Sequence, residues 1–375
     1  MDNDYIMERK KSYDSHLPFD VEAWCNILSG YTAESEFIPI NESLAKAFIN
    51  YYQNRFNSKD VFTKEDYLEL QRLENELSSV MKQFGSAFVR LSSRSPKDGM
   101  PLEDNGISEE YERIYSFLKE KYPPSVDLED ANLKFVACSE AQGKSLKMST
   151  APHAMNMMLT SERVFVDLLR IIDVPQPWRM NVVVRKWNDL IKDSMEFRIF
   201  VKNERIICIS QYNHYCVFPR ILEKYGKNEA PDSYNKLLTT VCDYWSIIHS
   251  KLIDTTNVHH NETYIEAYKN GYILDVGVIE KENNVLDCTV IELNPYERTT
   301  GSSLFNWNEI DRLSENNDIQ DIELRFLTKP REGIDNLIDD IILPAVHQQY
   351  TPYYDFYKGY NQKPSLLSNI ISFFK

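Results

Sequence analysis

Residues 290–307, VIELNPYERTTGSSLFNW, place two oxygen-bearing side chains, Glu292 and Asn294, directly after an apolar run. In a β-strand, residues i and i+2 point to the same face of the sheet, so this carboxylate and this amide project together. Asp275 lies in an earlier β-like run, YILDVGV, at residues 272–278. If the two runs pair as a hairpin, Asp275 joins the other two side chains on one sheet surface.

Three oxygen donors on a rigid sheet suit Mg²⁺, which prefers hard ligands and completes its octahedron with phosphates and water. The sequence therefore predicts a magnesium site formed by Asp275, Glu292 and Asn294. A structural alternative stays open at this point, because polar residues at strand ends also cap turns.

The composition is that of a globular protein with an acidic surface. The chain has 375 residues, of which 42% are apolar and 26% are charged, and it is long enough for one large domain or two smaller ones. Its formal net charge of −15 argues against general nucleic-acid binding, since phosphate repels an acidic surface. A nucleotide pocket can still be basic inside an acidic protein.

Targeting and redox signals favour the cytoplasm. The N-terminal residues MDNDYIMERKKSYD lack the apolar core of a secretory signal. The sequence has no run of about 18 apolar residues, so we expect no transmembrane segment. The six cysteines form no CxxC pair, which argues against a zinc site or a disulfide framework and favours a reducing compartment.

Helical and β-like patterns alternate irregularly, which indicates an α+β protein and not a doubly wound parallel sheet. Caps and apolar periodicity predict helices after Asn41 and Thr63 and over residues 108–120, 159–172 and 232–253. Runs rich in β-branched and aromatic residues predict short strands at 37–40 and 88–91 and a strand pair formed by 180–187 and 197–209.

The segment VVVRKWNDLIKDSMEF, residues 182–197, is suited to hold a nucleotide base. Arg185, Lys186 and Trp187 leave a predicted strand as extended chain. Free backbone groups in such a hinge can bind the edge of adenine, and Trp187 can stack on its ring. A strand that ends in a surface cation pair and a core Trp is the alternative.

Further cations occur in two strand-like segments. Arg198 has apolar neighbours, and a buried guanidinium suits phosphate oxygens. A structural salt bridge to Glu196 or Glu292 would explain Arg198 equally well. The segment FVRLSSRSPKDG, residues 88–99, offers Arg90, Arg94 and Lys97 beside serine hydroxyls, and it fits either an anion site or a solvated basic loop.

These segments, in this order, resemble the motifs of the cell division cycle protein 123 family. Residues 88–98 are similar to the family's strand followed by SPKDA, and residues 159–167 to its SSDRI…DL helix. Residues 184–187 and 196–211 resemble its LRKW and EFRCFVKNNELIGISQR motifs. Residues 292–307 look like its DFNPF…TDSLLFNW motif.

The resemblance, which covers residues 20–330, implies an ATP-grasp fold in which ATP lies between two α+β subdomains. It implies that Mg²⁺ is held by Asp275, Glu292 and Asn294. The nucleotide-binding residues that we expect are Arg90, in place of the family's phosphate-facing lysine, with Lys97, Arg185, Lys186, Trp187, Asn188 and Arg198. We expect a mobile N-terminus over 1–20, subdomains over 21–180 and 181–330, and a C-terminal extension over 331–375.

Members of the family act as assembly chaperones that join the α and γ subunits of eukaryotic translation initiation factor 2. The resemblance therefore implies an ATP- and magnesium-binding assembly chaperone whose partner is the γ subunit. Glu292 stands where the family has an aspartate, which keeps a second class open: an ATP-grasp ligase or phosphotransferase that activates a carboxylate or similar acceptor. No catalytic residue follows from the sequence. The C-terminal PSLLSNIISFFK fits an amphipathic membrane anchor or a helix docked on the body.

Overall fold

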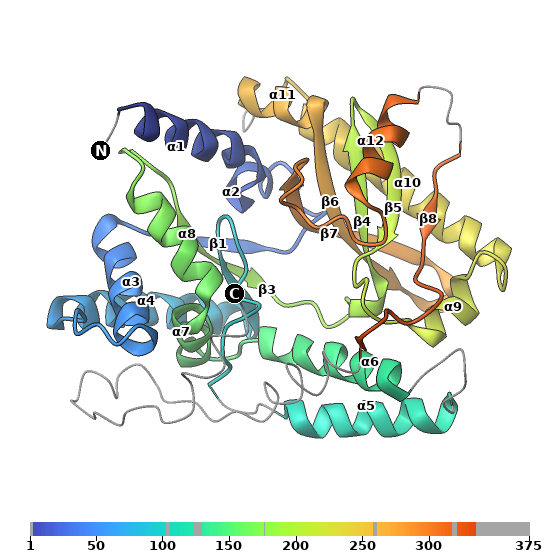
Figure 1. The fold of residues 1–375 in the computed structure, drawn as a ribbon, viewed down its shortest axis with the longest axis horizontal. Coiled ribbons are helices and arrows are strands. Elements are labelled where there is room, and N and C mark those ends of the chain that lie inside the picture. Colours follow the sequence, from blue (N-terminus) through green and yellow to red (C-terminus); the bar gives the residue numbers. More distant parts are fainter. Residues whose placement is uncertain are drawn as a thin grey trace.

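The computed structural model describes residues 3–102, 106–122, 130–175, 177–257, 261–316 and 321–334, with side chains from residue 7 onward. These residues form an α+β protein with one three-stranded and one five-stranded sheet (Figure 1). The predicted α+β class is therefore confirmed. Residues 335–375, which include PSLLSNIISFFK, lie outside the described residues.

The three-stranded sheet is antiparallel and has the order β1-β3-β2. Its strands are β1 (Ser35–Pro39), β2 (Ala87–Leu91) and β3 (Asn181–Lys186). Pro39 lies at the end of an edge strand, where proline is tolerated although it has no N–H to donate to the sheet. The short strands predicted at 37–40 and 88–91 are thus confirmed.

Four helices pack against this sheet and share one apolar core with it. They are α3 (Glu42–Phe56), α4 (Lys64–Phe84), α7 (Ala151–Thr160) and α8 (Glu162–Ile172). The predicted caps are confirmed, since Asn41 Oδ1 accepts from the Leu44 N–H at 2.8 Å and Thr63 forms a capping box with Asp66.

The single helix predicted over residues 159–172 is wrong, because Ser161 divides it into α7 and α8. Ser161 is extended, with φ −76° and ψ 120°, and its side chain accepts from the Val164 N–H as the N-cap of α8. Its hydroxyl also donates to Asp98 at 2.5 Å. A serine whose side chain hydrogen-bonds to the nearby backbone can end one helix and start the next. The spacing of apolar residues, on which the prediction was based, does not show such a break.

The five-stranded sheet has the order β7-β6-β4-β5-β8, and only its β5–β8 pair is parallel. Its strands are β4 (Glu196–Lys202), β5 (Arg205–Gln211), β6 (Gly271–Glu280), β7 (Leu286–Pro295) and β8 (Leu324–Arg325). The predicted pairing of 180–187 with 197–209 is wrong. The first run is β3 of the other sheet, and the second turns at Asn203 and Glu204, both with positive φ, to form the β4–β5 hairpin.

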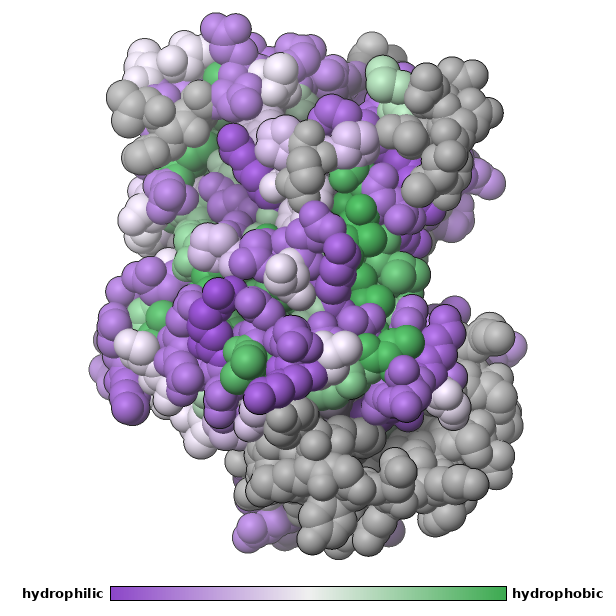
Figure 2. Space-filling model, turned by 90° about the vertical axis from the view of Figure 1, so that its left-hand side faces the viewer, coloured by the Kyte–Doolittle hydropathy of each residue, from purple (hydrophilic) through white to green (hydrophobic). Residues whose placement is uncertain are grey.

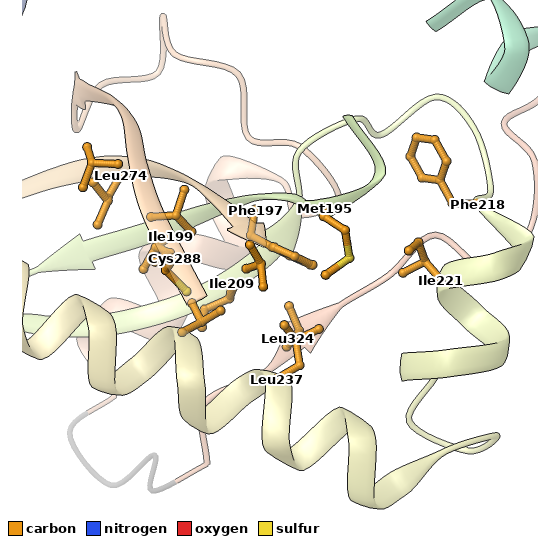
Figure 3. Packing of buried hydrophobic residues seen from close by; sticks show 14 of the residues in the cluster. Met195, Phe197, Ile199, Ile209, Phe218, Ile221, Leu237, Leu274, Cys288 and Leu324 are labelled. Carbon is orange, nitrogen blue, oxygen red and sulfur yellow. The ribbon is translucent and has the colours of Figure 1, made fainter. Parts of the chain in front are cut away.

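One face of the five-stranded sheet is covered by α10 (Pro231–Ile253), as Figure 3 shows for Leu237 of this helix lying among sheet residues. Phe197, Ile199 and Val201 of β4 belong to this core. Because side chains alternate along a strand, Glu196 and Arg198 point to the opposite face. The predicted helix over 232–253 is confirmed.

Of six further helices, five contribute side chains to this core, and the last packs in a separate cluster with Phe200 and Ile273. They are α2 (Val21–Trp24), α5 (Ile107–Lys121), α6 (Asp130–Gly143), α9 (Pro219–Tyr225), α11 (Glu262–Asn270) and α12 (Trp307–Glu315). Short 3₁₀ helices lie at Leu17–Phe19, Lys144–Leu146, Asp193–Met195 and Glu282–Asn284. Within the described ranges, none of these helices is long and apolar enough to cross a membrane.

The N-terminus, which we expected to be mobile over residues 1–20, forms the helix α1 (Asn3–His16). Arg9 pairs with Asp173 at 2.6 Å, and His16 lies 3.3 Å from Glu297. Figure 2 shows the side of the molecule that carries α1 and α3, where hydrophilic side chains cover most of the surface. The proposed subdomain bounds stay a prediction, and residues 21–28 share a core with strands of the second sheet.

Candidate functional site

A cleft with a volume of about 2630 Å³ has residues of both sheets in its lining. Ordinary small-molecule pockets have about 300–1,000 Å³, so this cleft is large enough for a nucleotide and for a further group beside it. Eight of the ten predicted site residues line it: Lys97, Arg185, Lys186, Trp187, Asn188, Arg198, Glu292 and Asn294. Arg90 and Asp275 are buried and contact this set.

The predicted hairpin of β6 and β7 is confirmed, and it brings the three candidate metal ligands together. Asp275 lies opposite Glu292 in the strand register, and Asn294 lies opposite Ile273. Asn294 Nδ2 donates to Asp275 Oδ2 at 3.1 Å. A register irregularity after Asp275 marks a local break in the ladder, a feature that often redirects a side chain.

Arg198 of β4 pairs with Asp275 in a two-bond, buried ion pair. Its Nε and Nη2 donate to the two carboxylate oxygens at 2.8 Å each, and its Nη1 donates to the Gly301 carbonyl at 2.6 Å. Asp275 is 1% exposed. Burial lowers the pKa of Arg198, but Asp275 outweighs it and raises that pKa above its usual value. The salt-bridge interpretation of Arg198 is thus correct in kind, with Asp275 as its partner instead of Glu196 or Glu292.

Arg90 of β2 pairs with Glu292 of β7 through a single contact, and so links the two sheets. Arg90 Nη2 lies 2.6 Å from Glu292 Oε1, and Arg90 Nε donates to the Leu91 carbonyl at 2.9 Å. Burial raises the pKa of Glu292, while Arg90, Lys97 and Arg198 together hold it below its usual range. Each candidate metal carboxylate is therefore already paired with an arginine.

The donor set fits magnesium in kind, with two carboxylates and one amide. In the described ranges, no group of three or more His, Cys, Asp or Glu side chains is arranged to hold a metal ion. The carboxylates of Asp275 and Glu292 point to arginines, so metal binding requires these two ion pairs to open or to share their oxygens.

The hinge segment lines the cleft, but its backbone is less free than we expected. The Lys186 N–H donates to the Glu34 carbonyl at 2.8 Å, and the Trp187 N–H donates to the Ser86 carbonyl at 3.0 Å. Trp187 Nε1 donates to Asp189 at 2.9 Å. Base recognition at Lys186 and Trp187 would therefore use groups other than these two N–H donors.

Arg185 and Asn188 have structural contacts of their own. Arg185 is buried, donates to the Ile291 carbonyl and to Thr32 Oγ1, and lies over the Trp24 ring. Burial and the nearby Arg90 lower the pKa of Arg185 to about 10. Asn188 Oδ1 accepts from the Leu190 N–H at 3.0 Å. These contacts stabilise the edge of the cleft whether or not a ligand is present.

Two cleft residues were not among the predicted site residues. Tyr212 follows β5, and the cations of Arg198 and Lys97 both lie over its ring. Lys97 Nζ also donates to the Tyr212 hydroxyl at 3.1 Å. Glu196 precedes Arg198 on the same strand face, and within the described part of the chain its carboxylate has no hydrogen bond or ion pair. Burial and the neighbouring Asp193 raise the pKa of Glu196 to about 8. The i, i+2 rule that selected Glu292 and Asn294 would have selected Glu196 with Arg198.

The chain matches the family model described as D123 over residues 41–340. It belongs to the D123 family. The resemblance to the cell division cycle protein 123 family is thereby confirmed. Among the relatives of this D123 chain is "Cell division cycle protein 123" of Candida glabrata, which is 23% identical over 306 residues that cover 80% of this chain and 69% of the relative.

A second relative of the D123 chain is the "Translation initiation factor eIF2 assembly protein" of Kluyveromyces lactis, 22% identical over 70% of this chain and 55% of the relative. The match thus spans little more than half of that protein. Among solved structures, C-terminally truncated Cdc123 from Schizosaccharomyces pombe aligns with a TM-score of 0.49 and 17% identity, over 82% of this chain and 95% of that one.

Proposed function

We propose that this D123-family protein is an assembly factor for translation initiation factor eIF2 that binds Mg-ATP in its cleft, with an ATP-grasp arrangement of the two sheets. The observation that carries the nucleotide proposal is the convergence of Arg198, Asp275, Glu292 and Asn294 on one sheet face beside the cleft. The partner is supported by relatives that are named eIF2 assembly proteins.

In this proposal, Arg90 and Arg198 release their carboxylate partners and bind phosphate groups of the nucleotide instead. Both guanidiniums are buried and partnered, and a guanidinium binds phosphate and carboxylate oxygens with the same two-pronged geometry. Glu292 and Asp275, released from the arginines, would hold Mg²⁺ together with Asn294. The metal would supply the positive charge that the triphosphate needs. Lys97 lies against Tyr212 in the same lining and would add one more cation.

Thermal unfolding with ATP, with and without Mg²⁺, tests the nucleotide proposal. A ligand present at about 100 times its Kd raises the free energy of unfolding by about 2.7 kcal/mol. We expect this gain for the wild type with Mg-ATP, and a much smaller one for Glu292→Gln. Glu282→Gln is the matched control, because it removes an exposed carboxylate from a turn outside the cleft. An absent shift at millimolar Mg-ATP would refute nucleotide binding.

Co-purification tests the partner. We expect the wild type to capture the γ subunit of eIF2 and to promote its joining with the α subunit. Glu292→Gln should reduce joining while the protein stays folded, and Glu282→Gln should leave it intact. If the wild type binds Mg-ATP but captures no γ subunit, the partner is wrong and the nucleotide site stands.

Glu196 favours a second candidate, an ATP-grasp ligase or phosphotransferase acting on a carboxylate or similar acceptor. A carboxyl group in the cleft with a pKa of about 8 can exchange a proton near neutral pH, which a non-catalytic site does not need. Release of ADP that depends on an added acceptor, and that Glu196→Gln abolishes, would support this candidate. Stoichiometric capture of a subunit without turnover would exclude it.

A further inference from the structure

Asp20 is a deeply buried acidic residue that borders the cleft. It is 6% exposed and it is among the lining residues. It occupies the N-cap position of α2, yet its side chain does not cap that helix. Across the described part of the chain, its carboxylate makes no hydrogen bond and no ion pair. A carboxyl group with so little exposure is usually hydrogen-bonded within the protein, so Asp20 is available to a partner that enters from the cleft.

Two further carboxylates close to Asp20 are each only half satisfied. Glu22 accepts from Ser92 and from Asn181, both at 2.8 Å and both on Oε1, while its buried Oε2 has no hydrogen bond. Asp167 accepts from Ser93 on Oδ2 at 2.8 Å, while its buried Oδ1 has no hydrogen bond. These two oxygens are closed off from the cleft, so Asp20 is the carboxyl group of this region that a ligand in the cleft can reach.

The cations nearby are engaged elsewhere or lie at the surface. Arg90 pairs with Glu292, and Arg94 contacts the already occupied Oδ2 of Asp167 at 3.3 Å. Arg170 lies 3.8 Å from Asp167 Oδ1 with a side chain that is 67% exposed. Burial, and after it the nearby negative charge of Glu22, raise the pKa of Asp20 well above its ordinary value, although the positive charge of Arg90 acts in the opposite direction. A cation placed against Asp20 from the cleft would favour the charged form of this carboxyl group, which burial now disfavours.

The chemistry of this region selects the kind of cation that would fit. No three acidic or imidazole side chains in the described ranges are arranged to hold a metal ion, which argues against a second metal. The rings of Tyr13 and Phe19 line the cleft with Asp20, and aromatic faces attract organic cations. An alkylammonium group donates up to three hydrogen bonds and can use separate carboxylate oxygens at once.

We propose that Asp20, together with Asp167, forms a subsite for one alkylammonium group, supplied by a lysine side chain that reaches into the cleft. This subsite is separate from the Glu292 site and does not depend on nucleotide binding. The ammonium group would give the Asp20 carboxylate a partner of opposite charge and remove the cost of burying that charge alone. The lysine can belong to a peptide segment or be a free amine, and the two sources are distinguished below.

The experiment titrates the full chain with the peptide acetyl-Gly-Lys-Gly-amide and with n-butylamine, and it follows binding by calorimetry. The peptide acetyl-Gly-norleucine-Gly-amide is the uncharged control of equal length. We expect the lysine peptide to bind the wild type and to bind Asp20→Asn at least about tenfold more weakly, as for the loss of a buried charge partner. Glu162→Gln, an exposed carboxylate in the lining of the same cleft, should bind like the wild type.

Each outcome decides the proposal. Binding of the lysine peptide but not of butylamine assigns the subsite to a polypeptide lysine, and binding of both assigns it to amines in general. Equal binding by Asp20→Asn and wild type overturns the proposal, as does equal binding of the norleucine peptide. The free Asp20→Asn protein should also melt higher than the wild type, since it lacks an unpaired buried carboxylate. If Asp20→Asn and Asp20→Ala both fail to fold, Asp20 is structural and the proposal is wrong.

Discussion

Replacing Asp275 by alanine tests the energetic weight of the ion pair at the centre of the candidate site. The change removes the acceptor of two hydrogen bonds from Arg198 and of one from Asn294. Arg198 is 7% exposed, so its guanidinium would stay buried with its charge uncompensated. Removing one partner of a buried pair costs about 3–5 kcal/mol. The Gly301 carbonyl remains bonded to Nη1, so we expect the lower part of this range, about 3 kcal/mol.

Urea unfolding of four proteins measures this cost: wild type, Asp275→Ala, Arg198→Met and the double variant. The double variant has no unpaired buried ion. Its loss in free energy of unfolding should therefore be smaller than the sum of the two single-variant losses, by about 2 kcal/mol or more. Glu297→Ala is the control, because its contact with His16 is exposed and should contribute less than about 1 kcal/mol. If the loss of the double variant equals the sum of the two single losses, the interaction between Arg198 and Asp275 contributes nothing to stability.

Glu196→Gln should stabilise the protein more at pH 8 than at pH 5. The folded-state pKa of about 8 exceeds the ordinary 4.5, so the wild type loses stability as pH rises between these values. The full pKa shift corresponds to about 4–5 kcal/mol of stability, and because water reaches the cleft we expect a pH-dependent gain of about 1–2 kcal/mol. An equal difference in melting temperature between variant and wild type at both pH values would contradict this expectation. Ser161→Ala should cost about 1 kcal/mol in urea unfolding through the lost N-cap of α8, whereas an unchanged midpoint would argue against the cap. Gly99→Ala should lower the melting temperature by several degrees, because a Cβ would lie 2.1 Å from the Met157 carbonyl oxygen; a wild-type melting curve would show that the backbone there moves freely.

Local rules predicted the part of the candidate site that depends on local geometry. Strand alternation placed Glu292 and Asn294 on one face, and a hairpin between neighbouring runs brought Asp275 to them. Helix caps at Asn41 and Thr63 were equally local, because a side chain bonds an N–H only three residues away.

Partners that are distant in the sequence were beyond these rules. Arg90 of the three-stranded sheet pairs with Glu292 of the five-stranded sheet, and no periodicity encodes a contact between two sheets. The same limit explains β3, whose β-branched residues specify a strand but not the sheet that the strand joins. Asp20 escaped notice because a single acidic residue before a short helix looks like an ordinary cap.

The segment around α2 has a consequence for synthesis on the ribosome. Its residues 21–28 pack in the core of the five-stranded sheet, and Thr32 bonds to the Val290 carbonyl, 258 positions further along the chain. At about 5–20 residues per second, the ribosome needs about 13–52 s to make that partner. The three-stranded sheet is complete once residue 186 has emerged, so it can fold first. Throughout that interval the apolar side chains of Trp24 and Leu28 remain without their core, and nascent-chain chaperones have a defined stretch to protect.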